Sequence, residues 1–266
     1  MLEIAIFNSS SAVIAYTSAA DRLELCADGS STNGGTTPTL DTLRSVIDSL
    51  NQSTHHLQRR KNIPIYAMIR PRAGDFVYSE EEFRVMKEQL RQLKEADYSG
   101  SSGDYFKFGR VDGFVFGILT PDNKVDRTRN EELVRLAAPL PCTFHRAFDQ
   151  VIQAGGGTSG EIISDDVRGQ LKSIIDAGFA AILTSGGEKT ALEGAEKIAA
   201  LTEAADGRIA IIAGGGVRST NARDLRHRAG TMVFHSSAVV DHSDVASSEE
   251  VRALKREVSS LTTRCS

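Results

Sequence analysis

Ionisable side chains stand inside the stretch CTFHRAFD, residues 142–149, which otherwise begins as a buried strand should. His145, Arg146 and Asp149 arrive before the apolar pattern has ended. An unpaired charge in a core strand is costly, so these residues need a reason to be there. An imidazole can transfer a proton near neutral pH, and a guanidinium can bind a carboxylate or a phosphate. The stretch therefore predicts a ligand or catalytic site at the end of a strand.

Polar side chains also close other apolar runs, and strand parity decides which of them can meet. Side chains alternate between the two faces of a strand, so Glu24 shares a face with Cys26. By the same parity Met68 shares a face with Arg70. Inward residues of several strands can converge on one volume if the strands form a barrel. We expect four such residues there: Glu24, Arg70, His145 and His235.

The same parity separates the neighbours His145 and Arg146. Adjacent residues of a strand cannot both point inward. His145 should enter the interior, whereas Arg146 should lean outward between strand and helices, where it needs a carboxylate partner. Asp149 should lie in a loop just beyond the strand. We therefore expect His145→Ala to leave folding nearly intact and Arg146→Ala to destabilise the protein.

The converging residues suit proton transfer on an anionic substrate. His145 could act as a general acid or base, oriented by Glu24 or Asp75. Arg70 and Arg72 could hold a phosphate or carboxylate group. No lysine closes any of the apolar runs, which disfavours Schiff-base chemistry. The candidate catalytic residues are thus Glu24, Arg70, Asp75 and His145; the alternative is a salt-bridged polar plug that only fills the barrel.

A glycine run offers a second signal for an anionic ligand. The segment AGGGVRS, residues 213–219, leaves an apolar run and enters a helical pattern. Backbone N–H groups of such a run can approach an anion, and a helix N-terminus favours it. Glycines also make tight turns, so the run alone is weak. The predicted anion-binding set is Arg72, Thr184, Ser185, Gly214, Gly215, Gly216, His235, Ser236 and Ser237.

Short apolar runs alternate with helical patterns along the whole chain. Eight runs read as strands: 2–7, 22–26, 63–69, 113–119, 142–148, 180–186, 209–216 and 231–237. Helical patterns lie between them, with candidate N-caps at Ser79, Asn130 and Ser164. This alternation predicts a parallel sheet with helical crossovers, and eight strands match a (β/α)8 barrel. A doubly wound open sheet is the runner-up, but the first run lacks the GxGxxG turn. We expect one domain over 1–266, with the barrel over about 2–240 and a C-terminal helix and tail over 247–266.

Composition narrows the class of protein. The 266 residues are 40% hydrophobic and 25% charged, with a formal net charge of −4, which is typical of a soluble globular domain. No basic cluster indicates nucleic-acid binding, and no apolar run is long enough to cross a membrane. The start of the chain does not resemble a secretory signal. The three cysteines are far apart without a CxxC pair, so we expect a reducing, cytoplasmic location.

Seven segments in this order resemble the signature segments of the CutC copper homeostasis family, over residues 2–240. They are RLELC, NGGTTPT, MIRPRAGDFVYS, TFHRAFD, LTSGG, AGGGVR and FHSSA. The resemblance implies a TIM barrel, a role in copper tolerance, Cu(I) binding and a homodimer. It implies no particular reaction.

Residue types and strand parity indicate which side chains could form the copper site that the resemblance implies. Cu(I) prefers soft thiolate and thioether ligands. Cys26 and Met68 lie on adjacent predicted strands with inward parity and are the candidate ligands, whereas Cys265 stands in a polar tail. Family members often have a further cysteine after GDF, where this chain has Val77. The two hypotheses are therefore Cu(I) binding dependent on Cys26, and an enzyme acting on a small phosphorylated or carboxylated metabolite at the barrel mouth.

Overall fold

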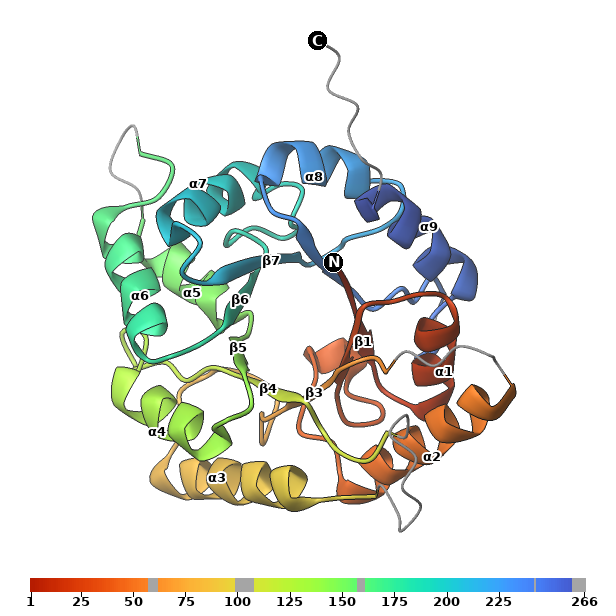
Figure 1. Ribbon diagram of the computed structural model, residues 1–266. Coiled ribbons are helices and arrows are strands. Elements are labelled where there is room, and N and C mark those ends of the chain that lie inside the picture. The colour runs from red at the N-terminus through yellow and green to blue at the C-terminus, as the bar shows by residue number, and fades with distance from the viewer. Residues whose placement is uncertain (57–61, 99–107, 157–160, 242, 260–266) are drawn as a thin grey trace.

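Eight parallel strands close into a barrel in the computed structural model, which describes residues 1–56, 62–98, 108–156, 161–241 and 243–259 (Figure 1). Each strand pairs with the next in sequence, and the first pairs with the last. The (β/α)8 prediction is confirmed. The strands are β1 (Leu2–Ile6), β2 (Arg22–Leu25), β3 (Ile65–Met68), β4 (Gly113–Phe116), β5 (Cys142–Phe144), β6 (Ala181–Thr184), β7 (Ala210–Gly214) and β8 (Val233–Ser236).

Helices form a ring around the barrel, because each parallel strand needs a crossover to reach the next. Figure 1 shows this ring along the barrel axis. The helices are α1 (Ser9–Thr17), α2 (Leu40–His56), α3 (Glu80–Glu95), α4 (Arg127–Ala137), α5 (Ala147–Ala154), α6 (Asp165–Asp176), α7 (Ala195–Ala205), α8 (Ala222–Ala229) and α9 (Ser248–Ser259). A short 3-10 turn, η1 (Ser31–Asn33), lies between β2 and α2.

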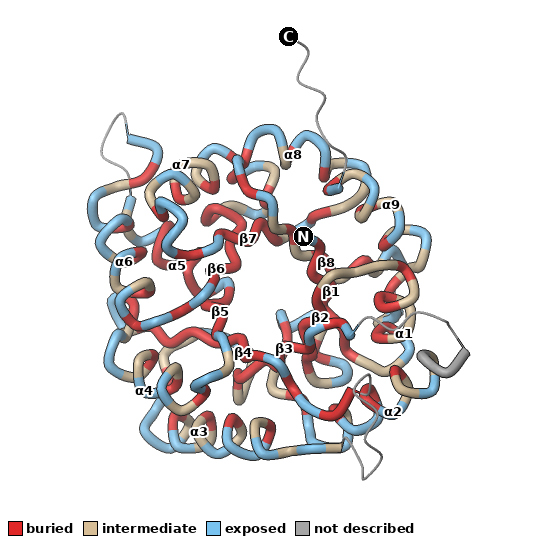
Figure 2. The backbone as a smooth tube through the Cα atoms, viewed as in Figure 1, coloured by how far each residue is buried: buried red, intermediate tan, exposed pale blue. Residues whose placement is uncertain are grey.

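Alternation along the strands divides the barrel into two packed regions. Outward strand side chains such as Ile4, Leu25 and Phe144 join the apolar helix faces in one large core (Figure 2). Inward side chains are mixed: Val115 and Tyr66 belong to a small separate apolar cluster inside the barrel. Cys142 lies in this outer core as well. The interior is therefore the region that accepts polar groups.

Two of the three capping residues predicted from sequence are confirmed. Ser79 closes a capping box with Glu82, and Ser164 accepts from the Val167 amide at the start of α6. The predicted cap at Asn130 is wrong, because Asp126 caps α4. Asn130 is instead fully buried and binds the Ile118 amide and carbonyl, which joins α4 to the end of β4.

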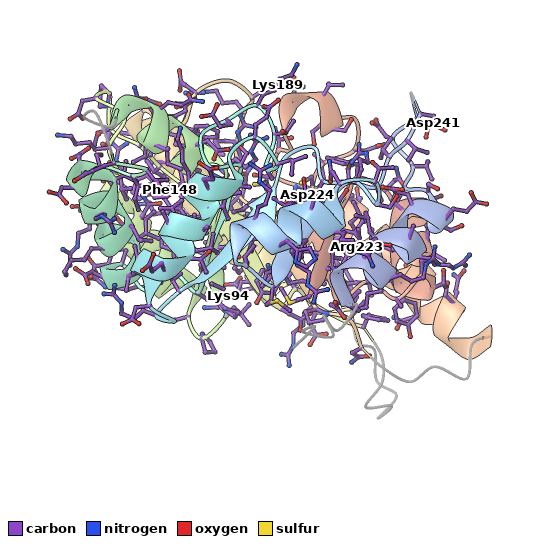
Figure 3. All side chains as sticks on the ribbon, turned by 90° about the horizontal axis from the view of Figure 1, so that it is seen from above. Lys94, Phe148, Lys189, Arg223, Asp224 and Asp241 are labelled. Atoms are coloured by element: carbon purple, nitrogen blue, oxygen red, sulfur yellow. The ribbon has the colours of Figure 1, made fainter. Side chains whose placement is uncertain are left out.

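The two ends of the barrel differ in which loops they hold. Figure 3 shows Lys189 and Asp241 near one end and Lys94 near the opposite end. Lys189 follows β6 and Asp241 follows β8, so they mark the face where strands end; Lys94 precedes β4. That C-terminal face is where barrels place their functional loops. Within the described residues, no helix is both long and apolar enough to span a membrane.

Candidate functional site at the barrel mouth

A cavity of about 570 Å³ opens at the C-terminal face. Its wall includes six inward side chains named from strand parity, of which His235 comes from the last strand. These are Glu24, Cys26, Met68, Arg70, His145 and His235. Strands β2, β3, β5 and β8 thus each contribute to one volume, as parity predicted.

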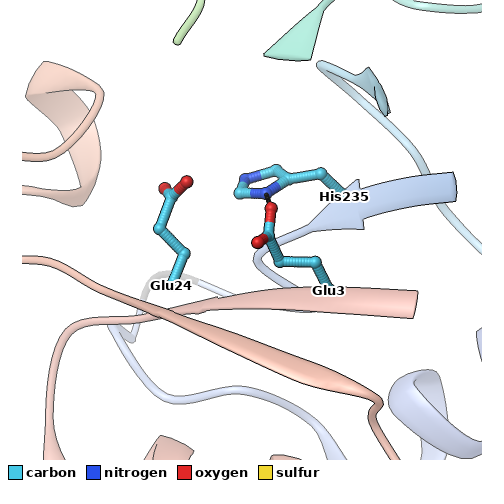
Figure 4. A group of neighbouring side chains, drawn as sticks. All are labelled: Glu3, Glu24 and His235. Carbon is cyan, nitrogen blue, oxygen red and sulfur yellow. Dashed lines mark hydrogen bonds and ion pairs between the residues drawn. The ribbon is translucent and has the colours of Figure 1, made fainter. Parts of the chain in front are cut away.

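A network of charged groups, which we call the floor, lies at and behind the cavity wall: Glu24 and His235 line the cavity, whereas Glu3 and Arg22 do not. Glu3 lies between Arg22 and His235, with 2.7 Å between its Oε1 and His235 Nδ1. Figure 4 shows the Glu24 carboxylate facing the imidazole of His235, with Glu3 below the ring. Ligand atoms of Glu3, Glu24 and His235 lie within 4.8 Å of one another, a spacing that could hold a metal ion. Both Glu3 oxygens already have cationic partners, so the arrangement better suits shared protons.

Burial and charge set the protonation of this floor. Burial raises the pKa of Glu24 to about 7, with the Glu3 charge adding to the rise and His235 opposing it. Burial acts to raise the pKa of Glu3 too, but the His235 hydrogen bond and the Arg22 charge bring it below its usual range. Burial acts to lower the pKa of His235, but Glu24 and Glu3 raise it overall. The directions of these shifts favour an ionised Glu3 and a protonated His235, while the Glu24 pKa of about 7 leaves that carboxyl between its two forms near neutral pH.

Two sulfur side chains meet beside the floor, at Gly35. A Cβ atom built on Gly35 would lie 2.6 Å from Cys26 Sγ and 3.5 Å from Met68 Cε. Gly35 has φ +84°, so glycine is required here both for conformation and for space. The Cys26 thiol donates to Glu24 Oε1 at 3.8 Å. Burial and the neighbouring Glu24 charge raise the pKa of this thiol well above its usual range.

Arg70 is a buried cation without a carboxylate partner among the described residues. Its Nη1 donates to the carbonyls of Asn33 (2.6 Å) and Gly35 (3.0 Å), and its Nη2 donates to Gly74 (2.8 Å). The guanidinium lies 4.9 Å from the ring centre of Phe76. Its Nε has no hydrogen-bond partner in the described part of the chain. Three neutral carbonyls leave the charge uncompensated, so Arg70 favours an anion in the cavity.

His145 occupies the centre of the mouth as a neutral imidazole. Burial, together with the Arg70 charge, lowers its pKa to about 3. Its Nδ1 accepts from the Ala147 amide (3.3 Å), and its Nε2 has no partner in the described ranges. The ring centre is 4.7 Å from that of Phe76. The orientation by Glu24 or Asp75 expected from sequence is not seen among the described residues, because neither carboxylate binds either ring nitrogen.

The prediction that Arg146 lies outward between strand and helices is wrong. β5 ends at Phe144, so strand alternation no longer applies, and Arg146 begins α5 instead. Its exposed side chain lines the cavity, with Nε 2.7 Å from Asp149 Oδ2 and Nη2 2.9 Å from Ser185 Oγ. Asp149 is the carboxylate that Arg146 was expected to need, but it is the buried member of the pair.

The glycine run forms a concave stretch of backbone at the opposite wall. Gly215 and Gly216 have φ +107° and +67°. These two residues and Val217 line the cavity, and their amides donate no hydrogen bond to any residue that the structure describes. Successive free N–H groups in such a turn make an anion-binding concavity. Arg218 adjoins them, with Nη1 3.2 Å from Ser236 Oγ.

Other predicted residues lie outside the cavity wall. Arg72 and Asp75 bind each other at 2.9 Å, and Arg72 also binds Glu82, at the outer rim. Thr184 and Ser185 are fully buried and donate to Asp149, so they support α5 from behind. Gly214 faces the barrel interior, where a Cβ would meet Leu183 at 2.5 Å and His235 at 3.1 Å.

Of the predicted set, Gly215, Gly216, His235, Ser236 and Ser237 do line the cavity. Sequence reasoning missed Arg218 and Gly35 as parts of the site. Arg218 stands in the very segment that drew attention, AGGGVRS, so its position there was a usable signal. Gly35 belongs to a loop whose path over Cys26 no strand or helix pattern reveals.

Comparison with known proteins gives a consistent result. The family model described as "CutC family" matches residues 1–240. A human copper homeostasis protein cutC homolog is 37% identical over 238 residues, which cover 90% of this chain and 73% of the human protein. The Caenorhabditis elegans homolog of the same name is 35% identical over 271 residues, covering 96% and 93% of the two chains.

Solved structures agree with the fold. The crystal structure of a copper homeostasis protein CutC from Streptococcus agalactiae matches with a TM-score of 0.68 and 30% identity, over 89% of this chain and 98% of that one. Thiamine phosphate pyrophosphorylase from Pyrococcus furiosus matches with a TM-score of 0.54 at 13% identity, over 97% and 94% of the two chains. At that identity the second match shows the shared barrel fold alone.

Proposed function

Because the chain belongs to the CutC family, we propose that it serves copper homeostasis by binding one Cu(I) ion at Cys26, with Met68 as a second soft ligand. The observation that carries this proposal is the meeting of the Cys26 sulfur and the Met68 methyl group at Gly35, on the cavity wall. Thiolate and thioether are the ligand types that Cu(I) prefers. The copper ion is cargo in this proposal and not a resident cofactor.

Metal binding here requires loss of the thiol proton. Cys26 is a buried thiol whose pKa is raised by burial and by Glu24, so it is protonated at neutral pH in the protein alone. A bound metal ion deprotonates a coordinating thiol outright. Copper affinity should therefore increase as pH rises, because each bound ion displaces one proton.

Competitive titration of cysteine variants tests the copper site. Cys26→Ser should lose Cu(I) binding against a Cu(I) chelator of known affinity. Cys142→Ser is the matched control, because Cys142 is equally buried but lies in the core between barrel and helices. Cys265→Ser is a second control; Cys265 lies outside the described residues. Full copper binding by Cys26→Ser would contradict the proposal.

A second candidate function is favoured by the buried cation Arg70. Its charge has only carbonyl partners, and it shares a cavity with the free amides of Gly215–Val217. We propose as the alternative an enzyme that acts on a small phosphorylated or carboxylated metabolite at the mouth, with Arg70 holding the anion and Glu24 and His145 facing the reacting end. Asp75 does not line that wall. It binds Arg72, so any catalytic role of Asp75 would have to act through Arg72.

Ligand-induced stabilisation tests the anion binding that the enzyme alternative requires. Inorganic phosphate and small carboxylates, added without copper, should raise the melting temperature if the mouth binds anions. Arg70→Gln should reduce that shift. An unchanged melting temperature with every phosphorylated or carboxylated compound would argue against the enzyme.

The proposal also includes a cellular location and an oligomeric state. We propose a cytoplasmic location, supported by the free state of the two described cysteines, Cys26 and Cys142. We propose a homodimer because the family resemblance implies one. Light scattering on the purified protein measures the latter directly, and a monomer mass at micromolar concentration would contradict it.

A further inference from the structure

The cavity offers Cu(I) few soft donors. Within the described part of the chain, Cys26 contributes the one thiol of the wall and Met68 the one thioether. A thioether is a weak donor beside a thiolate, and the nearest other groups are oxygen or imidazole ligands. The protein alone therefore supplies a small soft ligand set, and a further thiolate on the ion would have to come from outside the chain.

The cavity is far larger than a copper ion needs. Its volume of about 570 Å³ lies in the range of pockets that bind whole small molecules, roughly 300–1,000 Å³. The same cavity is lined by Cys26 and Met68 and by Gly215 and Arg218. The volume thus has room for a molecule that accompanies the ion.

The charge of the wall indicates the chemistry of that molecule. Arg70 lies on one side of Gly35, whose carbonyl it binds at 3.0 Å, and the Cys26 thiol lies on the other side. The Arg70 side chain is buried to all but 5%, and its Nε is unpartnered in the described residues. Across the cavity stand Arg146 and the free amides of Gly215–Val217. Two separate groups of donors fit a ligand with more than one acidic group.

We propose that the cavity receives Cu(I) together with a small carboxylate-bearing thiol, whose thiolate stays on the ion beside Cys26. One carboxylate of this co-ligand binds near Arg70, and a second binds the Gly215–Val217 amides and Arg146. The inference rests on the proposed Cu(I) function and adds the class of the accompanying ligand.

Delivery is a ligand exchange without oxidation or reduction. The ion arrives with two carrier thiolates. The Cys26 sulfur replaces one of them, and the Cys26 proton passes to the departing thiolate, which leaves as a thiol. The product holds Cu(I) between the Cys26 thiolate and the remaining carrier thiolate, so charge and atoms balance.

Native mass spectrometry of the full-length protein tests the proposal. Glutathione is the probe, because it has one thiol and two carboxylates. Its diethyl ester is the matched control, because it keeps the thiol and loses both carboxylate charges. With Cu(I) present, glutathione should form a complex of protein, copper and thiol that persists to at least about tenfold lower thiol concentration than with the ester, since each charge-assisted contact contributes roughly 1.5–3 kcal/mol.

Substitutions in the protein test the carboxylate contacts independently of changes in the thiol. Arg146→Gln should weaken glutathione retention about tenfold. Arg84→Gln should have no effect, because Arg84 pairs with Glu81 on the outside of α3. Equal retention of glutathione and its ester, or a copper complex that contains no thiol, overturns the proposal even if Cys26→Ser abolishes copper binding. Full copper binding by Cys26→Ser would instead remove the proposed Cu(I) site itself.

Discussion

Two histidines in one cavity have pKa values shifted in opposite directions, because their neighbours differ. His145 packs against Phe76 and lies near Arg70, so burial and a like charge both disfavour its protonated form. His235 is also buried, but it faces Glu24 and binds Glu3, and these carboxylates outweigh the effect of burial. The pKa of about 3 keeps His145 a neutral hydrogen-bonding group at neutral pH, whereas Glu24 and Glu3 favour the protonated form of His235. The same residue type serves two different electrostatic tasks.

The lowered pKa of His145 predicts a pH-dependent loss of stability. The unfolded chain binds this proton near pH 6.5, whereas the folded protein resists it until about pH 3. The stabilising contribution is therefore present above about pH 6.5 and is lost as pH falls toward 3. Replacing His145 by the neutral Gln should remove this dependence. Relative to His145→Gln, the native protein should lose about 3 kcal/mol of unfolding free energy between pH 7 and pH 4, measured by urea unfolding. Parallel curves for the two proteins would refute the assignment.

The ion pair between Arg146 and Asp149 predicts unequal effects of its two members. Asp149 is buried and also accepts from Thr184, Ser185 and Gly187, so Asp149→Ala leaves several buried donors unpaired. We expect a loss of about 3 kcal/mol or more. Arg146 is exposed and Asp149 keeps its other donors, so Arg146→Ala should cost less than about 1 kcal/mol. This replaces the larger effect expected from sequence. Thermal melts decide, and a greater loss with Arg146→Ala would contradict the structure.

At the scale of elements, the connection between β2 and α2 controls access to the Cys26 sulfur. Gly29 and Gly35 both have positive φ, +69° and +84°, but only Gly35 touches Cys26. A Cβ on Gly29 would meet nothing within 4 Å. The two glycines thus form a matched pair that separates backbone strain from contact with the thiol.

Alanine at these two positions should have different consequences. Gly29→Ala should cost about 1 kcal/mol, from the left-handed conformation alone. Gly35→Ala should cost a further 1–3 kcal/mol or so, because the new methyl group overlaps Cys26 Sγ. It should also weaken Cu(I) binding, and Gly29→Ala should not. Denaturant melts and competitive copper titration of both variants measure this. Equal copper affinity of the two variants would show that the loop does not adjoin the copper site.

Sequence patterns predicted the site residues that lie on strands or directly after them, but not those whose position depends on a loop. Strand parity brought Glu24 and Arg70 to one cavity, because a period of two persists through and just beyond a strand. Parity failed at Arg146, because β5 is only three residues long and the chain turns into α5. The Gly35 contact and the free amides of Gly215–Val217 depend on loop dihedrals. Such dihedrals have no periodic signal, so the residues could be suspected as glycines but not placed.

At the scale of the whole molecule, α9 completes the ring of helices around the barrel. This helix follows β8 and fills the ring position between α8 and α1, so it belongs to the barrel although the family model ends at residue 240 (Figure 1). Its Val251, Leu254 and Val258 are buried. Glu250 binds the amide and hydroxyl of Ser219, both at 2.7 Å, just after the glycine run. The helix therefore supports both the β1 side of the barrel and the segment that follows the glycine run.

Truncation of a buried α9 side chain should therefore lower the stability of the whole barrel, which should still unfold in a single transition. Leu254 is fully buried, so Leu254→Ala removes packing from the joint core and leaves a cavity. We expect a loss of about 2–5 kcal/mol in the free energy of unfolding, without a separate early transition, because β1 and β8 close the same sheet. Arg252→Ala is the control on the exposed face of the helix and should change stability by less than about 0.5 kcal/mol. Circular dichroism and intrinsic tyrosine fluorescence should report coincident denaturant transitions for both variants. If Leu254→Ala instead melts α9 alone while the barrel transition stays unchanged, the helix is an appendage, and the support that Glu250 gives to the glycine run is dispensable.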